Sequence, residues 1–224
     1  MSDVASNILQ LNSELPANVK LVAVSKTKTV ADILEAYNAG HKCFGENKAQ
    51  ELLAKKDLLP SDIEWHFIGH LQTNKVKFIT PFISMIQSVD SVKLLKVINS
   101  EAAKIGKIVN CLLQLYIAEE ETKFGFSMDE LISLFESETL DNMSNIKICG
   151  LMGMASFTDN TGQVRKEFMY LKKCFDKLKS EYFSENSYFR EVSIGMSSDY
   201  KIAIEAGSTM VRIGSMVFGE RGAI

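Results

Sequence analysis

The sequence has few cysteines and prolines, no excess of positive charge and no long apolar run, and each shortage excludes a class of protein. The four cysteines, Cys43, Cys111, Cys149 and Cys174, contain no Cys-x-x-Cys pair, so we expect neither a disulfide framework nor a zinc ribbon. The first three lie in apolar runs, where a free thiol behaves as a small hydrophobe, and this favours the reducing cytoplasm. The net charge is -3 at pH 7, and without an overall positive field we expect no nucleic-acid partner.

Membrane, secretion and metal-site signals are also missing. The most apolar stretch, residues 108–118, is interrupted by Asn110 and Gln114 and is too short to cross a bilayer. The N-terminal residues include no basic segment followed by an apolar run, so no signal peptide is expected. His66 and His70 lie outside any helical pattern with no third ligand obvious nearby, so we interpret them as core or loop histidines and expect no metal site.

The domain organisation follows from the scarcity of chain breaks. Only three prolines occur, each between expected elements, and no linker or low-complexity segment divides the chain. We therefore expect one domain over residues 1–224. Apolar residues at helical spacing predict an extra N-terminal helix over residues 3–15.

From residue 21 onward, short apolar strands alternate with helical patterns. The expected strands are residues 21–25, 42–45, 64–68, 84–88, 108–116, 146–152, 191–194 and 210–213. The expected helices are residues 30–38, 48–56, 74–79, 92–104, 128–137, 162–183 and 199–206. This alternation predicts a parallel sheet, and about eight units in one domain predict a (β/α)8 TIM barrel. An open doubly wound sheet is the alternative, but it usually has fewer strands, and no Gly-x-Gly-x-x-Gly follows the first strand.

Lys26 directly follows the first expected strand, at the end where a TIM barrel carries its active site. Strand alternation would place it on the same side as Val22 and Val24, with its amine at the mouth of the barrel interior. Burying an ammonium is costly, and a lysine in this position is suited to forming a Schiff base with a carbonyl compound. The alternative is a lysine whose amine reaches solvent at the strand end.

Glycines and serines follow the seventh and eighth expected strands, where this fold commonly binds phosphate. Gly195 and Gly214 would allow the backbone to approach a phosphate closely, and Ser193, Ser197 or Ser198 could donate hydroxyl hydrogen bonds. The alternative is two turn glycines and a serine cap for the helix that begins near residue 199. With a lysine amine across the barrel mouth, a phosphate-bearing aldehyde fits this arrangement, and pyridoxal 5'-phosphate (PLP) is such a compound.

Arg212 lies in the last expected strand, on the opposite side from Ile213. An arginine inside a barrel keeps its proton and needs an acceptor, and the pyridine nitrogen of PLP is one. That nitrogen would stay unprotonated, which makes the ring a weaker electron sink for carbanion chemistry. A salt bridge to Glu46 or Glu220 is the alternative. Other strand ends carry the polar residues Asn47, His70 and Asp90.

Segments from near the start of the chain to its end resemble the pyridoxal phosphate homeostasis proteins, small barrels related to the N-terminal domain of bacterial alanine racemase. They are LVAVSK at 21–26, FGEN at 44–47, WHFIG at 65–69, SVD at 88–90, KFGFS at 123–127, GLMGM at 150–154, SIGMS at 193–197, GSTMVRIG at 207–214 and FGER at 218–221. The resemblance implies a single-domain barrel with PLP held as a Schiff base on Lys26. The residues implied to contact the cofactor are Lys26, Asn47, Ser193, Met196, Ser197, Arg212, Gly214 and Ser215. The loop 193–197 and Gly214 with Ser215 would hold the phosphate, and Arg212 would face the pyridine nitrogen.

The resemblance also implies a role in keeping intracellular PLP low yet available, without demonstrated catalytic turnover. We expect a cofactor carrier or regulator whose partner is PLP, with apo PLP enzymes as candidate recipients. An amino-acid racemase or decarboxylase is the alternative. A Schiff-base aldolase in which Lys26 attacks a sugar phosphate is a third hypothesis; it lacks a nearby acidic general base on the same strands, although Glu46 could be argued for that role. In the related racemase a second base and a dimer contact come from a C-terminal β domain that this sequence does not contain. We therefore expect no racemisation, which needs two bases, and a monomeric protein.

Overall fold

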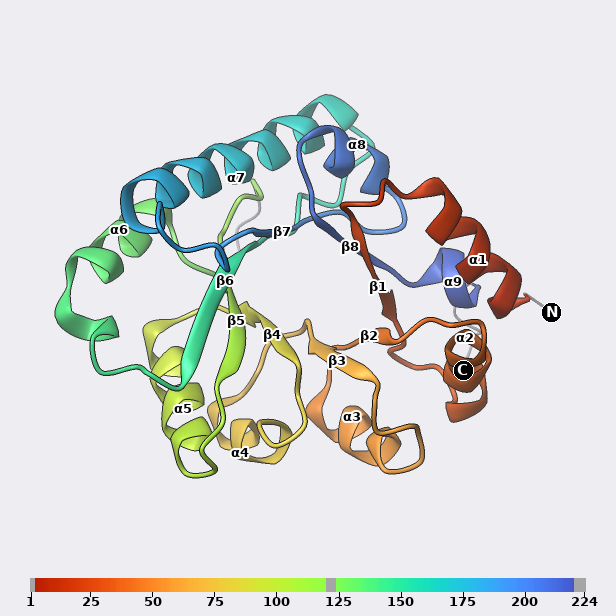
Figure 1. Cartoon of the computed structure of the whole chain (residues 1–224). Coiled ribbons are helices and arrows are strands. Elements are labelled where there is room, and N and C mark those ends of the chain that lie inside the picture. Colours follow the sequence, from red (N-terminus) through yellow and green to blue (C-terminus); the bar gives the residue numbers. More distant parts are fainter. Residues whose placement is uncertain (1–2, 120–123, 220–224) are drawn as a thin grey trace.

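Eight parallel strands close into a barrel in which consecutive strands are neighbours and β8 pairs with β1 (Figure 1). This computed structural model describes residues 3–119 and 124–219. The strands are β1 Lys20–Val24, β2 Cys43–Glu46, β3 Glu64–Phe67, β4 Met85–Val89, β5 Val109–Gln114, β6 Ile146–Met152, β7 Glu191–Ser193 and β8 Met210–Ile213. The predicted (β/α)8 TIM barrel is confirmed, and the open-sheet alternative is wrong.

Helices follow the strands and lie around the outside of the barrel (Figure 1). They are α1 Val4–Glu14, α2 Val30–Asn38, α3 Ala49–Lys56, α4 Val76–Ile79, α5 Val92–Ala103, α6 Met128–Glu136, α7 Thr161–Tyr182, α8 Tyr200–Glu205 and α9 Ser215–Phe218, with the 3-10 turns η1 Thr73–Lys75 and η2 Glu138–Leu140. Within residues 3–119 and 124–219, none of these helices has both the length and the apolar composition that a bilayer span requires.

Two short segments differ from the sequence-based expectation. Residues 74–79 are predicted as one helix, but they form part of the 3-10 turn η1 followed by α4, and no side chain caps the start of α4. Helix α9, only 4 residues long, occupies the segment after β8, for which the sequence predicts no helix. A single turn is too short to produce a recognisable helical period.

The predicted N-terminal helix is present as α1, next to α2 and α9 (Figure 1). Its first turn is capped by Asp3, whose carboxylate accepts from the backbone N–H of Ser6 at 3.1 Å. The Asn7 side-chain amide donates to the carbonyl oxygen of Val217 at 3.0 Å. This bond attaches α1 to α9 and thereby supports the segment that follows β8.

Apolar side chains fill both the space between strands and helices and the interior of the barrel. The inner cluster consists of Val22, Cys43, Met85, Leu112, Cys149, Met152 and Met210. All four cysteines are free and buried. Burial raises the pKa of Cys43 to about 12 and that of Cys149 to about 11, so both stay neutral thiols at physiological pH.

Candidate functional site

A cavity of about 590 Å³ opens at the carboxyl ends of the strands, a volume typical of small-molecule sites. Its polar lining residues include Lys26, Lys28, Asn47, His70, Asp90, Ser197, Ser198, Arg212 and Ser215. Its apolar lining residues include Val24, Ile68, Phe124, Met154, Phe157 and Met196. Of the eight residues implied to contact the cofactor, all except Ser193 line this cavity, and Gly195, also proposed to approach the phosphate, does not line it. The barrel therefore brings together loops that are as much as 190 residues apart along the chain, as Lys28 and Phe218 show by their 3.0 Å hydrogen bond.

Lys26 lies half-buried in a turn directly after β1. The strand ends at Val24, earlier than predicted, so the turn rather than strand alternation sets the direction of the lysine side chain. Thr27, the next residue, has a φ of 65°, which is uncommon for a β-branched residue. Such a conformation persists only where the surrounding structure holds it in place.

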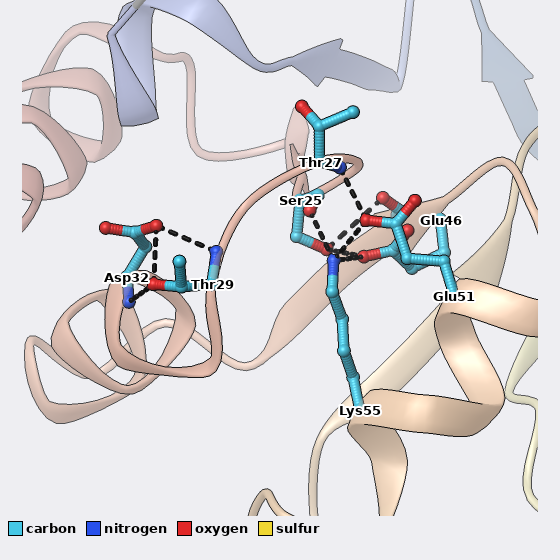
Figure 2. Close-up of polar contacts among 8 residues, drawn as sticks. Ser25, Thr27, Thr29, Asp32, Glu46, Glu51 and Lys55 are labelled. Atoms are coloured by element: carbon cyan, nitrogen blue, oxygen red, sulfur yellow. Dashed lines mark hydrogen bonds and ion pairs between the residues drawn. The ribbon is translucent and has the colours of Figure 1, made fainter. Parts of the chain in front are cut away.

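A buried polar network holds this turn against α3 (Figure 2). The ammonium of Lys55 donates to the carbonyl oxygen of Ser25 at 2.8 Å, to Glu46 at 2.8 Å and to Glu51 at 2.6 Å. Glu51 also accepts from the backbone N–H of Thr27 at 2.5 Å, and the Ser25 hydroxyl donates to Glu46 at 2.7 Å. Burial raises the pKa of Glu46, and its hydrogen bonds to Lys55 and Ser25 oppose that shift. The residues on both sides of Lys26 are thus fixed by one ammonium and two carboxylates.

The far end of the same turn is fixed by the start of α2 (Figure 2). The Thr29 hydroxyl accepts from the backbone N–H of Asp32 at 3.2 Å, and the Asp32 carboxylate accepts from the backbone N–H of Thr29 at 2.8 Å. This reciprocal pair is a capping box, which satisfies donors at the helix start. Lys26 is therefore carried on a segment anchored at both ends.

Arg212 on β8 is buried at the floor of the cavity, where its guanidinium donates to main-chain and hydroxyl oxygens. It donates to the carbonyl oxygen of Ser193 at 2.8 Å, to the Ser193 hydroxyl at 2.7 Å and to the carbonyl oxygen of Gly153 at 2.9 Å. Burial lowers the pKa of Arg212 to about 10, and nearby Asp199 opposes the shift, so the group stays protonated at neutral pH. The alternative salt bridge to Glu46 is wrong, because Glu46 pairs with Lys55; Glu220 lies outside the described residues.

Ser193 lies beneath the cavity rather than in its wall. Its hydroxyl accepts from Arg212 and donates to Gln87 at 2.7 Å, and the Gln87 amide lies 2.7 Å from Nδ1 of His66. This buried chain of hydrogen bonds runs from Arg212 into the barrel interior. Ser193, predicted to contact phosphate, is thus placed here against the guanidinium and is not among the residues that line the cavity.

At the inner end of that chain, Cys43, Glu64 and His66 bring their possible ligand atoms within 4.8 Å of one another. Cys43 and Glu64 come near His66 only when β2 and β3 pair, so the spacing along the sequence shows no third ligand beside His66. Glu64 already forms an ion pair with Lys20 at 2.5 Å. Burial lowers the pKa of His66 to about 3, so its imidazole is neutral at physiological pH.

The loops after β7 and β8 lie side by side at the cavity rim. The Ser197 hydroxyl accepts from the backbone N–H of Gly214 at 3.3 Å, which ties the two loops together. Asp199, not a serine, is the N-cap residue of α8, and its carboxylate accepts from the backbone N–H of Met196 at 2.5 Å. A Cβ atom at Gly214 would lie 3.3 Å from the carbonyl oxygen of Val24, so the backbone of this loop passes close to the end of β1.

Comparison with known proteins identifies the family. The model of the alanine racemase N-terminal domain matches residues 1–222. A pyridoxal phosphate homeostasis protein from Aquifex aeolicus is 42% identical over 203 residues, which cover 90% of this chain and 87% of the relative. Another from Synechocystis sp. is 37% identical over 214 residues, covering 95% and 96%. The chain belongs to the pyridoxal phosphate homeostasis protein family.

Solved structures agree with this family assignment. PipY of Synechococcus elongatus PCC7942 is 32% identical, and the match covers 96% of this chain and 100% of that one. The TM-score is 0.90 for PipY without PLP and 0.84 for PipY with PLP bound. Alanine racemase of Clostridium difficile 630 is 14% identical with a TM-score of 0.78, covering 100% of this chain and 61% of the racemase, which shows a shared fold.

In this member of the pyridoxal phosphate homeostasis family, the segments that carried the sequence resemblance converge on the cavity. Most of the residues that line the cavity lie within or beside these segments, in the ranges 24–28, 68–70, 196–198 and 212–215 and at 47, 90, 124 and 154. Lys123 and residues 220–221, which also belong to those segments, lie outside the described residues.

Two groups near the site were not predicted. The first is the network of Glu46, Glu51 and Lys55. One feature of the sequence could have indicated it, namely the i,i+4 spacing of Glu51 and Lys55 within an expected helix. The second group is a pair at the mouth of the cavity, in which Nδ1 of His70 lies 2.8 Å from Oδ2 of Asp90. The two residues are 20 positions apart, and no local pattern joins them.

Proposed function

We propose that this chain binds PLP as a Schiff base on Lys26 and acts in PLP homeostasis, holding the cofactor and releasing it, with residues 1–224 forming one PLP-binding domain. The observation that carries the proposal is a single cavity lined by Lys26, Arg212 and the loops after β7 and β8. The names of the curated relatives and the PLP bound to PipY support the choice of cofactor. PLP supplies an aldehyde that condenses with an amine and a phosphate that needs hydrogen-bond donors.

Unsatisfied polar groups in the cavity support the fit of PLP. Oδ1 of Asn47 is buried and has no hydrogen-bond partner among the described residues, which is unfavourable unless a ligand supplies a donor. Its backbone lies so close to Gly69 that a Cβ atom there would be 2.4 Å from the Asn47 carbonyl oxygen. The guanidinium of Arg212 has five N–H groups, and the bonds to Ser193 and Gly153 leave donors for an acceptor in the cavity.

The residues divide into distinct roles in this proposal. Lys26 supplies the amine, Asn47 lies beside the ring, and Arg212 faces the pyridine nitrogen. Met196, Ser197, Gly214 and Ser215 form the phosphate-binding loops, with hydroxyl and backbone N–H groups as donors. Ser193 acts indirectly, because it orients Arg212 and does not line the cavity.

An amino-acid racemase or decarboxylase is the second candidate function, and His70 with Asp90 is the observation that favours it. This pair places a proton acceptor in the same cavity as Lys26, and racemisation needs two bases. Against it, Arg212 is protonated and would keep a facing pyridine nitrogen unprotonated, which weakens the ring as an electron sink. The aldolase hypothesis loses its acid–base group, since Glu46 is fully buried, bonded to Lys55 and absent from the cavity lining.

The cellular part of the proposal concerns location and partners. We propose a monomer in the cytoplasm that passes PLP to apo PLP enzymes. The free, buried thiols suit a reducing compartment. Light scattering of the purified protein tests the monomer, and activation of an apo PLP enzyme by the loaded protein, compared with free PLP, tests delivery.

Substitution of the lysines tests the Schiff base. Lys26→Ala should abolish the visible absorbance of the bound cofactor, whereas Lys28→Ala and Lys75→Ala should keep it. Borohydride reduction followed by peptide mass spectrometry then locates the modified lysine. Unchanged absorbance in Lys26→Ala would move the attachment to another lysine. A racemase assay over several amino acids separates the two functions, and turnover above about 1 per second would favour the enzyme.

A further inference from the structure

His70 and Asp90 form a hydrogen-bonded pair at the mouth of the cavity that holds Lys26. His70 follows β3 and Asp90 follows β4, and both side chains line the cavity. The distance between Nδ1 of His70 and Oδ2 of Asp90 is 2.8 Å. The histidine side chain is 60% exposed and that of the aspartate only 12%, so the imidazole is the part that meets solvent and incoming ligands.

The pair has the arrangement of an oriented proton acceptor. A carboxylate only accepts hydrogen bonds, so Nδ1 of His70 carries a proton and donates the hydrogen bond to Asp90. In the neutral imidazole with its proton on Nδ1, Nε2 has the lone pair. The carboxylate then stabilises the imidazolium that forms when Nε2 takes a proton, which is how a histidine–aspartate pair works in general base catalysis. The ring of Phe124 lies beside that of His70, with centroids 5.8 Å apart.

We propose that the His70–Asp90 pair is the proton acceptor for primary amines, and free amino acids in particular, that enter the cavity and exchange with Lys26. The proposal deepens the proposed function and rests on it, because it needs the cofactor attached to Lys26. A free amino acid carries an ammonium group at neutral pH, and an ammonium has no lone pair with which to attack a carbonyl or imine carbon. A neutral histidine is the side chain best suited to accept and return a proton near this pH.

The exchange balances in atoms and protons. Nε2 of His70 takes one proton from the incoming ammonium, and the resulting amine forms a new C–N bond at the carbon attached to Lys26. The C–N bond to Lys26 then breaks, and the incoming nitrogen gives up a second proton while its own C=N bond forms. Both protons end on the departing lysine amine, the first by way of His70, so His70 returns to its starting state. No oxidant or reductant is required.

The other charged groups in the same cavity are less suited to this role. Lys28, after β1, and Arg212, on β8, offer hydrogen-bond donors, and Lys26 is the residue whose bond is exchanged. Lys28 donates to the carbonyl oxygens of Phe218 and Gly219 at 3.0 and 3.2 Å. His70 with Asp90 is therefore the described lining group that offers both a lone pair and a carboxylate to stabilise the charge.

Stopped-flow absorbance with L-alanine tests the proposal. Each protein is saturated with PLP, freed of excess cofactor and mixed with L-alanine, and the rate of the spectral change is followed. His70→Gln should slow this rate by about 100-fold or more, the usual contribution of a general base, and Asp90→Asn should slow it less. Asp129→Asn is the matched control, since Asp129 is an exposed acid on α6 that does not line the cavity. L-lactate, which lacks the amine, should produce no change.

Rescue distinguishes a chemical role from a structural one. Imidazole in the buffer should restore exchange in His70→Gly, which a defect in packing would not allow. Rates in His70→Gln within about tenfold of wild type would overturn the inference. Absence of the Schiff-base absorbance in the wild-type protein would contradict the proposed function, whereas equal exchange rates in proteins that all have that absorbance would contradict only this inference.

Discussion

Removal of the Lys55 ammonium should destabilise the protein strongly, because it leaves a buried carboxylate without its ion-pair partner. The side chain of Lys55 is 10% exposed and that of Glu46 is 0% exposed. Loss of one partner of a buried ion pair costs about 3–5 kcal/mol. In a domain of this size, each kcal/mol of lost stability lowers the melting temperature by roughly 2–4 °C. Lys55→Met should therefore lower the melting temperature by about 6–20 °C.

A matched variant and a pH series make this prediction specific. Lys177→Met removes the ammonium of an exposed pair with Glu181 in α7, which has the same i,i+4 spacing as Lys55 with Glu51, and should cost at most about 1 kcal/mol. Burial raises the pKa of Glu46, and loss of Lys55 removes an interaction that opposes this shift. The cost in Lys55→Met is therefore present at neutral pH and shrinks as the pH falls towards the carboxyl range and Glu46 takes a proton.

Thermal melts of wild type, Lys55→Met and Lys177→Met between pH 5 and pH 8 give the result directly. Equal melting temperatures for the two variants, or a difference that does not shrink at low pH, would refute the assignment of Glu46 as a buried charge. PLP binding by Lys55→Met gives a second measurement. Since Lys55 holds Ser25 and Glu51 holds Thr27, we expect weaker retention of the cofactor on Lys26.

Two other predictions concern the phosphate loops and the barrel interior. Gly214→Asp should weaken PLP retention at least about tenfold by placing a negative charge beside the phosphate, while Gly214→Asn, which adds a side chain of similar size without the charge, should weaken it less. Equal retention in both variants, measured by equilibrium dialysis, would remove Gly214 from the phosphate site. Because burial lowers the pKa of His66 to about 3, below its value in the unfolded chain, its contribution to stability should fall as the pH drops from about 6.5 towards 3. NMR should show a constant His66 ring shift from pH 8 to pH 5, and an inflection above pH 5 would contradict this.

The sequence predicted the elements of the barrel well, because its strands and helices are encoded by local patterns. Strands β6 and β8 have the predicted bounds, and each of the others differs by one or two residues at one or both ends. Seven of the eight residues that the sequence implied to contact the cofactor line the cavity. In a parallel barrel every strand ends at the same face, so residues that follow strands converge without further information.

The tertiary structure decided what each of those residues contacts. Ser193 was expected to bind phosphate, but its hydroxyl bonds Arg212 and Gln87, a partner 106 residues away. Helix α4 shows the same limit locally, because the expected helix gives way to a 3-10 turn where no side chain caps it.

The sequence by itself thus determined the order of strands and helices, the end of the barrel that carries the site, and the lysine and arginine that enter it. Only the closed barrel decided the network that holds Lys26, the pairing of His70 with Asp90 and the position of Ser193. The physical reason is that hydrophobic period and strand ends are properties of neighbours in sequence. Hydrogen bonds and ion pairs instead depend on which strands become neighbours in space and in what register, as the pairing of Cys43 with Glu64 across β2 and β3 illustrates.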